Sequence, residues 1–236
     1  MSSSYQANRI DLDQEHQMVQ GDRWLKLSPH RKLGVVEYIL SNPDLCRKHI
    51  RISNKGVRQL SELKKSNPLK NYTQIRYIGS GVYGDVSLYK HHRDSKTYAV
   101  KTCFTSFSTD LAPTFNEILI AVALSNQNEL VRVKKILMNP ESKQVHIVME
   151  LLETPTFKER SRFEFKFPKM RLSFPRYGII LQDRHSGNFG IRMEGKRRKP
   201  VHIDFGLSTI NKDRLLTQLK NEIGPQPNRP GGGRRA

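Results

Sequence analysis

Five short runs of β-forming residues lie between residues 74 and 151, and one amphipathic helix, over about residues 114–125, interrupts them after the third run. Turn-forming stretches separate the runs at Gly79–Gly84, Arg93–Lys96 and Asn139–Lys143. Such runs, bounded by turn residues, are typical of strands. The runs are QIRYIG, DVSLYK, TYAVKTCF, VRVKKIL and VHIVMEL. This order predicts an α+β fold with a five-stranded antiparallel sheet and one inserted helix.

The segments on either side are polar and basic. Ser28, Pro29 and the helical spacing of apolar residues predict a helix over residues 28–40, and a second short helix is expected over residues 56–65. Residues 1–71 are thus predicted to be a basic, partly helical extension. Residues 211–236 are predicted to be a basic tail rich in Pro and Gly, and residues 212–236 are expected to contribute little to the fold.

Residues 79–86 follow the pattern G-x-G-x-x-G-x-V. Glycines allow a tight turn to lie close to phosphates, with backbone N–H groups facing the oxygens. The same glycines would suit an ordinary hairpin or a Rossmann turn, but a Rossmann turn leads into a helix. Because residues 85–90 are strand-like, a β-hairpin over a nucleotide is favoured. Its predicted binding residues are Gly79, Ser80, Gly81, Val82, Tyr83, Gly84 and Val86.

Two later segments carry residues suited to catalysis and metal binding. Asp183 and Asn188 are separated by four residues in QDRHSGN, and Asp204 begins Asp-Phe-Gly in HIDFG. A carboxylate can orient and deprotonate an attacking hydroxyl, and Mg²⁺ takes hard oxygen ligands such as those of Asn188 and Asp204. Each segment alone could be a turn. Their occurrence after the glycine segment and after Lys101 in Tyr-Ala-Val-Lys indicates one site for phosphate chemistry.

Together these motifs resemble those of the protein-kinase family over about residues 72–210. The resemblance implies a two-lobed fold with an N-lobe at residues 72–152 and a minimal C-lobe at residues 153–210. It also implies that the chain binds ATP and Mg²⁺. Lys101 would contact the α- and β-phosphates, and Glu117 would orient Lys101. The alternative for Lys101 is a surface lysine on an edge strand, and the alternative for Glu117 is an exposed helix carboxylate.

The resemblance assigns the remaining site residues as well. Asp183 would be the catalytic carboxylate, and Asn188 and Asp204 would hold the metal. The adenine pocket would be bordered by Ala99 and Met149, and the backbone from Glu150 to Leu152 would hydrogen-bond the base. A plain core strand is the alternative for this last segment.

Several residues depart from the family pattern. Gln182 replaces the arginine that would bind an activation-loop phosphate, and His185 stands where a lysine often faces the transferred phosphate. Protonated His185 is predicted to stabilise charge on that phosphate, or else to brace the loop through a backbone carbonyl. The Asp-Arg-His sequence resembles phosphoinositide kinases. Because no activation segment is visible after Gly206, the C-lobe is predicted either to be minimal or to be completed by a partner or by the N-terminal extension.

The formal charge of +19 predicts attraction to polyanions, including nucleic acids, unless the basic side chains are simply solvated. Residues 196–199 could be a nuclear-localisation signal, a phosphate-binding patch or an exposed hairpin tip. Cys46 and Cys103 give no disulfide framework, and no signal-peptide or membrane-spanning run is present. An intracellular protein, cytoplasmic or nuclear, is therefore expected.

Three functions are compatible with these patterns. An ATP- and Mg²⁺-dependent kinase acting on Ser or Thr of a protein is favoured. A kinase acting on a lipid head group or small molecule is suggested by the Asp-Arg-His sequence. A nucleotide-binding pseudokinase or scaffold is suggested by the short C-lobe, although the complete set of Lys101, Asp183, Asn188 and Asp204 argues against it, since such polar groups are costly to desolvate unless they bind something.

Overall fold

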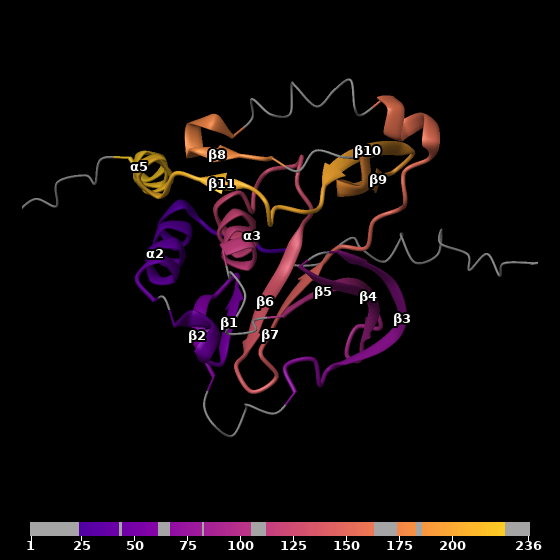
Figure 1. The fold of residues 1–236 in the computed structure, drawn as a ribbon, viewed down its shortest axis with the longest axis horizontal. Coiled ribbons are helices and arrows are strands. Elements are labelled where there is room, and N and C mark those ends of the chain that lie inside the picture. Colours follow the sequence, from indigo (N-terminus) through magenta and orange to yellow (C-terminus); the bar gives the residue numbers. More distant parts are fainter. Residues whose placement is uncertain are drawn as a thin grey trace, which may run out of the picture.

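The largest element of the computed structural model is a seven-stranded antiparallel sheet in the order β2–β1–β6–β7–β5–β4–β3 (Figure 1). The structure describes residues 24–42, 44–60, 67–81, 83–104, 112–162, 174–182 and 186–224. The helix α3 (Ala112–Ala123) lies in sequence between β5 and β6. The strands are β1 (Ile50–Ser53), β2 (Gly56–Gln59), β3 (Tyr72–Gly81), β4 (Gly84–His91), β5 (Thr97–Phe104), β6 (Val133–Asn139) and β7 (Gln144–Met149).

The mixed composition and the large antiparallel sheet agree with the prediction, but the sheet is wider than five strands. Residues 50–52 of β1 pair with β6, in the register Ile50↔Met138 and Ile52↔Ile136. The expected helix over residues 56–65 is wrong for residues 56–59, which form β2 and pair with β1. Pairing with an available sheet edge outweighed a weak local helix pattern. Residues 61–66 lie outside the described part of the chain.

Helix α2 (Pro29–Leu40) begins where the sequence predicts, and it packs against α3 and against α5 (Lys212–Ile223). The first turn of α5 is capped by Asn211, whose side chain accepts the Arg214 N–H at 2.9 Å. Leu215 and Leu219 of α5 are fully buried. The expectation that residues 212–236 contribute little to the fold is therefore wrong for residues 212–223, which dock through this apolar stripe.

Shorter elements lie along the top of the molecule in Figure 1. They are β8 (Ile179–Ile180) paired with β11 (Thr209–Ile210), and β9 (Phe189–Glu194) paired with β10 (Arg197–His202). A helical segment at residues 157–162 and the 3₁₀ turns η1 (Leu45–Arg47), η3 (Pro175–Tyr177) and η4 (Ser186–Asn188) complete the described elements. The β9–β10 hairpin is joined to the loop before β6, because His202 exchanges backbone hydrogen bonds of 2.9 Å with Glu129 and Val131.

The apolar core lies on both faces of the sheet. The larger cluster brings side chains of α2, α3 and α5 together with β1, β6 and β7, and includes Val36, Ile118, Ile147 and Leu215. A smaller cluster on other strand positions contains Trp24, Tyr72, Tyr98 and Val148. The extension at residues 24–59 thus contributes directly to the core. In the described part of the chain no helix is long and apolar enough to cross a membrane.

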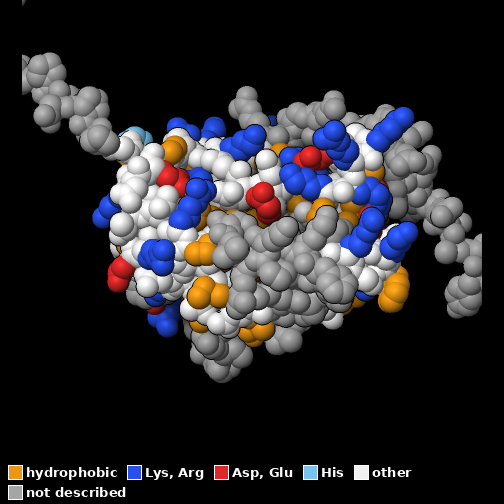
Figure 2. Space-filling view, turned by 90° about the horizontal axis from the view of Figure 1, so that it is seen from above, with side chains coloured by type: hydrophobic (Ala, Val, Ile, Leu, Met, Phe, Trp, Pro, Cys, Tyr) orange, Lys and Arg blue, Asp and Glu red, His pale blue; other side chains and the backbone are white. Residues whose placement is uncertain are grey.

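Basic side chains are spread over the surface seen in Figure 2 and are only sparsely accompanied by acidic ones. Several lie where β9, β10 and residues 157–162 meet, and the exposed members there include Lys158, Arg162, Lys196 and Arg197. The surplus charge is therefore displayed to solvent along this side of the molecule.

Candidate active site

The glycine segment forms the end of the β3–β4 hairpin, whose pairing runs to Gly81↔Gly84. Gly84 has φ of +152°, and a β-carbon there would lie 2.2 Å from the carbonyl oxygen of Thr102 on β5. Only glycine fits this conformation and this close approach. At Gly79, a β-carbon would meet no described atom within 4 Å, so the hairpin is open on that side. Val82 lies outside the described residues.

Lys101 lies in the interior of the sheet, on β5, between Val86 of β4 and Ile147 of β7. Its Nζ is 2.7 Å from Oε2 of Glu117 on α3 and 3.2 Å from Oδ2 of Asp204. Lys101 and Glu117 are only 5% and 3% exposed. Because a buried charge is tolerated only when it is paired, these contacts fix the lysine between the helix and the Asp-Phe-Gly segment.

The electrostatics of the cluster keep Lys101 charged. Burial disfavours its ammonium, but the carboxylates of Glu117 and Asp204 more than compensate, and the pKa of Lys101 is raised above its ordinary value. Burial raises the pKa of Glu117 to about 7, with Lys101 opposing the shift and Asp204 adding to it. A raised pKa of Glu117 favours its neutral form, whereas a charged Lys101 favours an ionised neighbour. The 2.7 Å contact supports the ionised pair.

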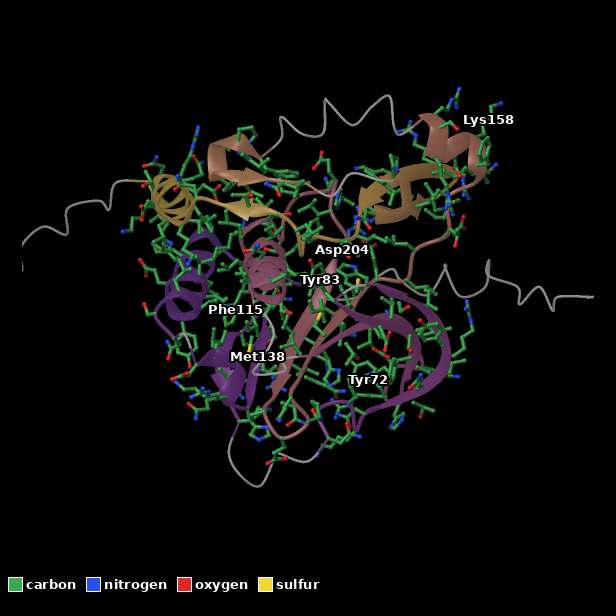
Figure 3. All side chains as sticks on the ribbon, viewed as in Figure 1. Tyr72, Tyr83, Phe115, Met138, Lys158 and Asp204 are labelled. Atoms are coloured by element: carbon green, nitrogen blue, oxygen red, sulfur yellow. The ribbon has the colours of Figure 1, made fainter. Side chains whose placement is uncertain are left out.

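The Asp-Phe-Gly segment is a tight turn beside the glycine hairpin. Oδ1 of Asp204 accepts the Gly206 N–H at 3.0 Å, and Phe205 is buried with its ring stacked on His202. A β-carbon at Gly206 would lie 3.2 Å from Cδ2 of Tyr83, so the tyrosine ring rests against this turn (Figure 3). The tip of the hairpin therefore contacts the Asp-Phe-Gly turn.

Asn188 lies next to this turn, because its carbonyl oxygen accepts the N–H of Ile203 at 3.0 Å. The amide oxygen of Asn188 and the carboxylate of Asp204 are hard donors that suit Mg²⁺. Within the described residues no group of three His, Cys, Asp or Glu side chains comes together as a metal site. Two such oxygens would leave the other positions around the ion to phosphates and water, which is how Mg²⁺ is usually bound.

The segment directly after β7, residues 150–152, is called the Glu150 segment and is held by a buried ion pair that the sequence did not predict. Glu150 and Arg192 of β9 are each 4% exposed, and Nε of Arg192 lies 2.9 Å from Oε2 of Glu150. Oε1 of Glu150 also accepts the Arg132 N–H at 2.7 Å. The Arg192 guanidinium donates further to the carbonyls of Asn128 and Leu130. An arginine inside the apolar run FGIRM was the available sequence signal for a buried partner.

The other predicted adenine-pocket residues surround the same segment. Met149 and Ala99 are buried and paired across β7 and β5. Leu152 is half-buried, and a β-carbon at Gly190 would lie 2.6 Å from its Cδ1, so β9 approaches this side chain closely. The N–H of Glu150 is bonded to the Arg132 carbonyl at 2.9 Å. Of the predicted backbone contacts to a base, the N–H of Glu150 is thus already used within the protein.

The predicted catalytic residues Asp183 and His185 lie outside the described residues, but both flanks of their loop are anchored. On one side, Nε2 of Gln182 donates to Oγ1 of Thr209 at 2.6 Å. On the other side, Asn188 is tied to Ile203. Gln182 therefore binds the strand that follows the Asp-Phe-Gly turn.

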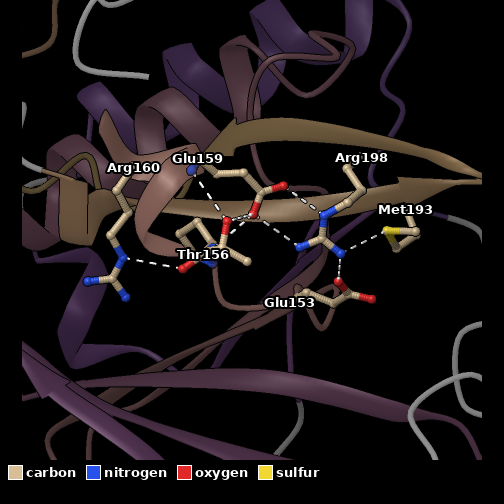
Figure 4. A network of polar contacts seen from close by, with 7 residues as sticks. Glu153, Thr156, Glu159, Arg160, Met193 and Arg198 are labelled. Atoms are coloured by element: carbon tan, nitrogen blue, oxygen red, sulfur yellow. Dashed lines mark hydrogen bonds and ion pairs between the residues drawn. The ribbon is translucent and has the colours of Figure 1, made fainter. Parts of the chain in front are cut away.

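A polar network fixes the chain beyond the Glu150 segment (Figure 4). Thr156 and Glu159 form a capping box at the start of residues 157–162, with the Thr156 N–H 2.8 Å from Oε2 of Glu159. Arg198 of β10 donates to Glu159 at 2.7 Å and also contacts Glu153. Arg198 holds the pKa of Glu159 down to about 2, so this link is ionised at neutral pH. The network ties the segment to the β9–β10 hairpin.

Comparison with known proteins gives a consistent family. The model of the protein kinase domain matches residues 72–181. The chain is 28% identical over 134 residues to the serine/threonine-protein kinase GRIK2 of Arabidopsis thaliana, an alignment that covers 52% of this chain and 32% of the relative. It is 27% identical over 88 residues to extracellular signal-regulated kinase 2 of Dictyostelium discoideum, covering 36% of this chain and 24% of the relative. The match over residues 72–181 and these kinase relatives support membership of the protein-kinase-like superfamily.

The kinase match includes the β3–β4 hairpin, Lys101, Glu117 and the Glu150 segment, and it ends before Asp183, Asn188 and Asp204. The structure nevertheless brings Asp204 to Lys101, 103 residues away in number, within 3.2 Å. The similarities support a kinase at low identity, over a third or less of each relative's length.

Proposed function

We propose that the chain is an ATP- and Mg²⁺-dependent phosphotransferase, and specifically a divergent Ser/Thr protein kinase that transfers the γ-phosphate of ATP to a hydroxyl. The observation that carries the proposal is the buried Lys101 between Glu117 and Asp204, next to the glycine hairpin. In this arrangement an ammonium and a carboxylate are preorganised for a triphosphate and its metal.

Each residue has a role in the proposal. Backbone N–H groups of residues 79–84 and the ammonium of Lys101 bind phosphates, and Glu117 orients Lys101. Ala99, Met149 and the carbonyl of Glu150 with the N–H of Leu152 receive the adenine. Asn188 and Asp204 hold Mg²⁺, which supplies charge neutralisation when bound. Asp183 orients the attacking hydroxyl, and His185 stabilises the transferred phosphate.

One labelling experiment distinguishes the proposed function from two other functions. The Asp-Arg-His sequence favours a lipid or small-molecule kinase, and a pseudokinase would bind nucleotide without turnover. The purified chain is incubated with γ-labelled ATP and Mg²⁺, with a generic protein substrate, with phosphoinositide vesicles, or alone. Label on the protein substrate supports a protein kinase, label on lipid supports the second function, and binding without transfer supports the third.

The matched variants are Lys101→Met and Lys90→Met. Lys90 is an exposed lysine of β4, outside the candidate site. Loss of the Lys101 ammonium should lower transfer at least about a hundredfold, as removal of a preorganised charge-stabilising donor does in other enzymes. Lys90→Met should retain transfer. Equal activity of the two variants would remove Lys101 from the mechanism.

A further inference from the structure

Helix α3 contacts the Asp-Phe-Gly turn through two consecutive residues. Glu117 acts indirectly, through Lys101, whose Nζ lies 3.2 Å from Asp204. Asn116 acts directly, because its Nδ2 donates to the carbonyl of Ser208 at 2.6 Å and lies 3.4 Å from the carbonyl of Gly206. The first link holds the beginning of the turn, and the second holds its end.

Internal bonds make residues 204–208 one unit. The Gly206 N–H donates to Oδ1 of Asp204 at 3.0 Å, and the Ser208 N–H donates to the carbonyl of Phe205 at 3.0 Å. Phe205 is 2% exposed and Ser208 is 5% exposed, so the turn is packed as well as bonded. A shift of Ser208 is therefore transmitted to the Asp204 carboxylate, because the intervening backbone has few other positions available to it.

The amide of Asn116 suits this position chemically. It offers two N–H donors to two backbone carbonyls of the turn, and it carries no charge that would compete with the Lys101 ammonium for Asp204. An aspartate could not donate these bonds. An alanine or leucine would leave the Ser208 carbonyl without this donor, and an unsatisfied buried carbonyl is costly.

We propose that Asn116 is a positioning residue that sets the orientation of Asp204 for Mg²⁺ and couples it to the position of α3. This inference rests on the proposed function, since it gives Asp204 the role of a metal ligand. The proposal gives Asn116 itself no contact with nucleotide or metal. It acts through the Gly206 and Ser208 carbonyls.

The test measures binding rather than turnover. Binding of a fluorescent ATP analogue to the full chain is titrated with Mg²⁺ for the wild type, Asn116→Ala and Asn116→Leu. Leucine matches the branching of asparagine without its donors, so it maintains packing if alanine does not. Loss of one hydrogen bond should raise the half-saturating Mg²⁺ concentration about fivefold. Nucleotide binding without Mg²⁺ should stay within about twofold of the wild type.

Asn126→Ala is the matched control. Asn126 follows α3 and also donates its amide to a backbone carbonyl, that of Leu27 at 3.4 Å, away from the Asp-Phe-Gly turn. It should leave the Mg²⁺ titration unchanged. If both Asn116 variants titrate like the wild type, or lose Mg²⁺-free binding equally, the positioning role is wrong. If the wild type itself shows no Mg²⁺-dependent nucleotide binding, the proposed function fails, and the role of Asn116 with it.

Discussion

Arg192 shows at the scale of one residue how the space beside the Glu150 segment is organised. Its guanidinium is buried, and Glu150, Asn128 and Leu130 accept its hydrogen bonds. A buried pair of this kind contributes little net stability compared with apolar residues, but removal of one partner leaves the other charge uncompensated. The pair therefore specifies one arrangement of β9 against the segment after β7.

Arg192→Met should destabilise the fold by about 3–5 kcal/mol, because it leaves the Glu150 carboxylate buried without its cation. The measurement is urea unfolding, with Arg197→Met, an exposed arginine of β10, as the control. A double variant, Arg192→Met with Glu150→Met, should recover much of the loss. If the single and double variants are equally unstable, the cost comes from packing and not from the unpaired charge.

His146 provides a pH-dependent contribution at the same scale. Burial lowers the pKa of His146 to about 4, and its Nδ1 lies 3.0 Å from Oγ1 of Thr102. The unfolded chain binds the proton near pH 6.5, whereas the folded chain binds it only near pH 4. Stability is therefore lost as pH falls through this window, by about 2 kcal/mol at pH 5.

Unfolding by urea at pH 7 and pH 5 tests this contribution. His146→Gln keeps a polar partner for Thr102 but cannot be protonated, so it should lose about 2 kcal/mol less than the wild type between the two pH values. An identical pH dependence in both proteins would show that other groups cause the acid loss.

At the scale of elements, α3 is enclosed rather than left at the surface. The sheet lies on one side of it, and α2 packs against another side and is itself covered by α5. The position of Glu117 is thus supported by helices from both flanks of the kinase-like region. Helix α2 of the N-terminal extension thus supplies apolar cover for α3 and α5. The sequence left open whether this extension completes a short C-lobe.

Leu219→Ala should destabilise the protein by about 2–4 kcal/mol, since Leu219 is fully buried where α5 docks. Thr217→Ala changes an exposed residue of the same helix and should have little effect. Thermal unfolding of both variants is the measurement. If Leu219→Ala is as stable as Thr217→Ala, α5 is not docked in solution. That result would agree with the sequence expectation that residues 212–236 contribute little to the fold.

Local features of this chain can be predicted from its sequence, whereas features that depend on distant partners cannot. The helix at residues 28–40 and the strands β3 to β7 follow from capping and turn residues that act over a few positions. β1, β2 and the docking of α5 depend on partners far away in the chain, so residues 56–59 and 212–223 were assigned wrongly. In the candidate site, Lys101 and Asp204 were proposed from motifs and Glu117 from the resemblance to protein kinases, whereas Asn116 and Arg192 belong to no motif and required the fold.

At the scale of the whole molecule, the formal charge is +19, and acidic side chains are sparse on the face seen in Figure 2. Nucleic acids and acidic polymers would release counterions on contact with such a surface. We expect binding of single-stranded DNA that weakens about tenfold to a hundredfold between 50 and 200 mM salt. The triple variant Lys158→Glu, Lys196→Glu and Arg197→Glu should reduce both the affinity and its salt dependence. Salt-independent binding would contradict this expectation.

The contact between α2 and α5 also has a consequence for the order of folding. The two helices come from opposite ends of the described chain, and contacts between distant segments form late because closing a long loop costs entropy. The hairpins β3–β4 and β6–β7 can form earlier from neighbouring residues. The docking of Leu215 and Leu219 is therefore expected to follow the formation of these hairpins. Until α5 docks, the part of α2 that α5 covers stays exposed, and the newly made chain is most prone to aggregate in that interval.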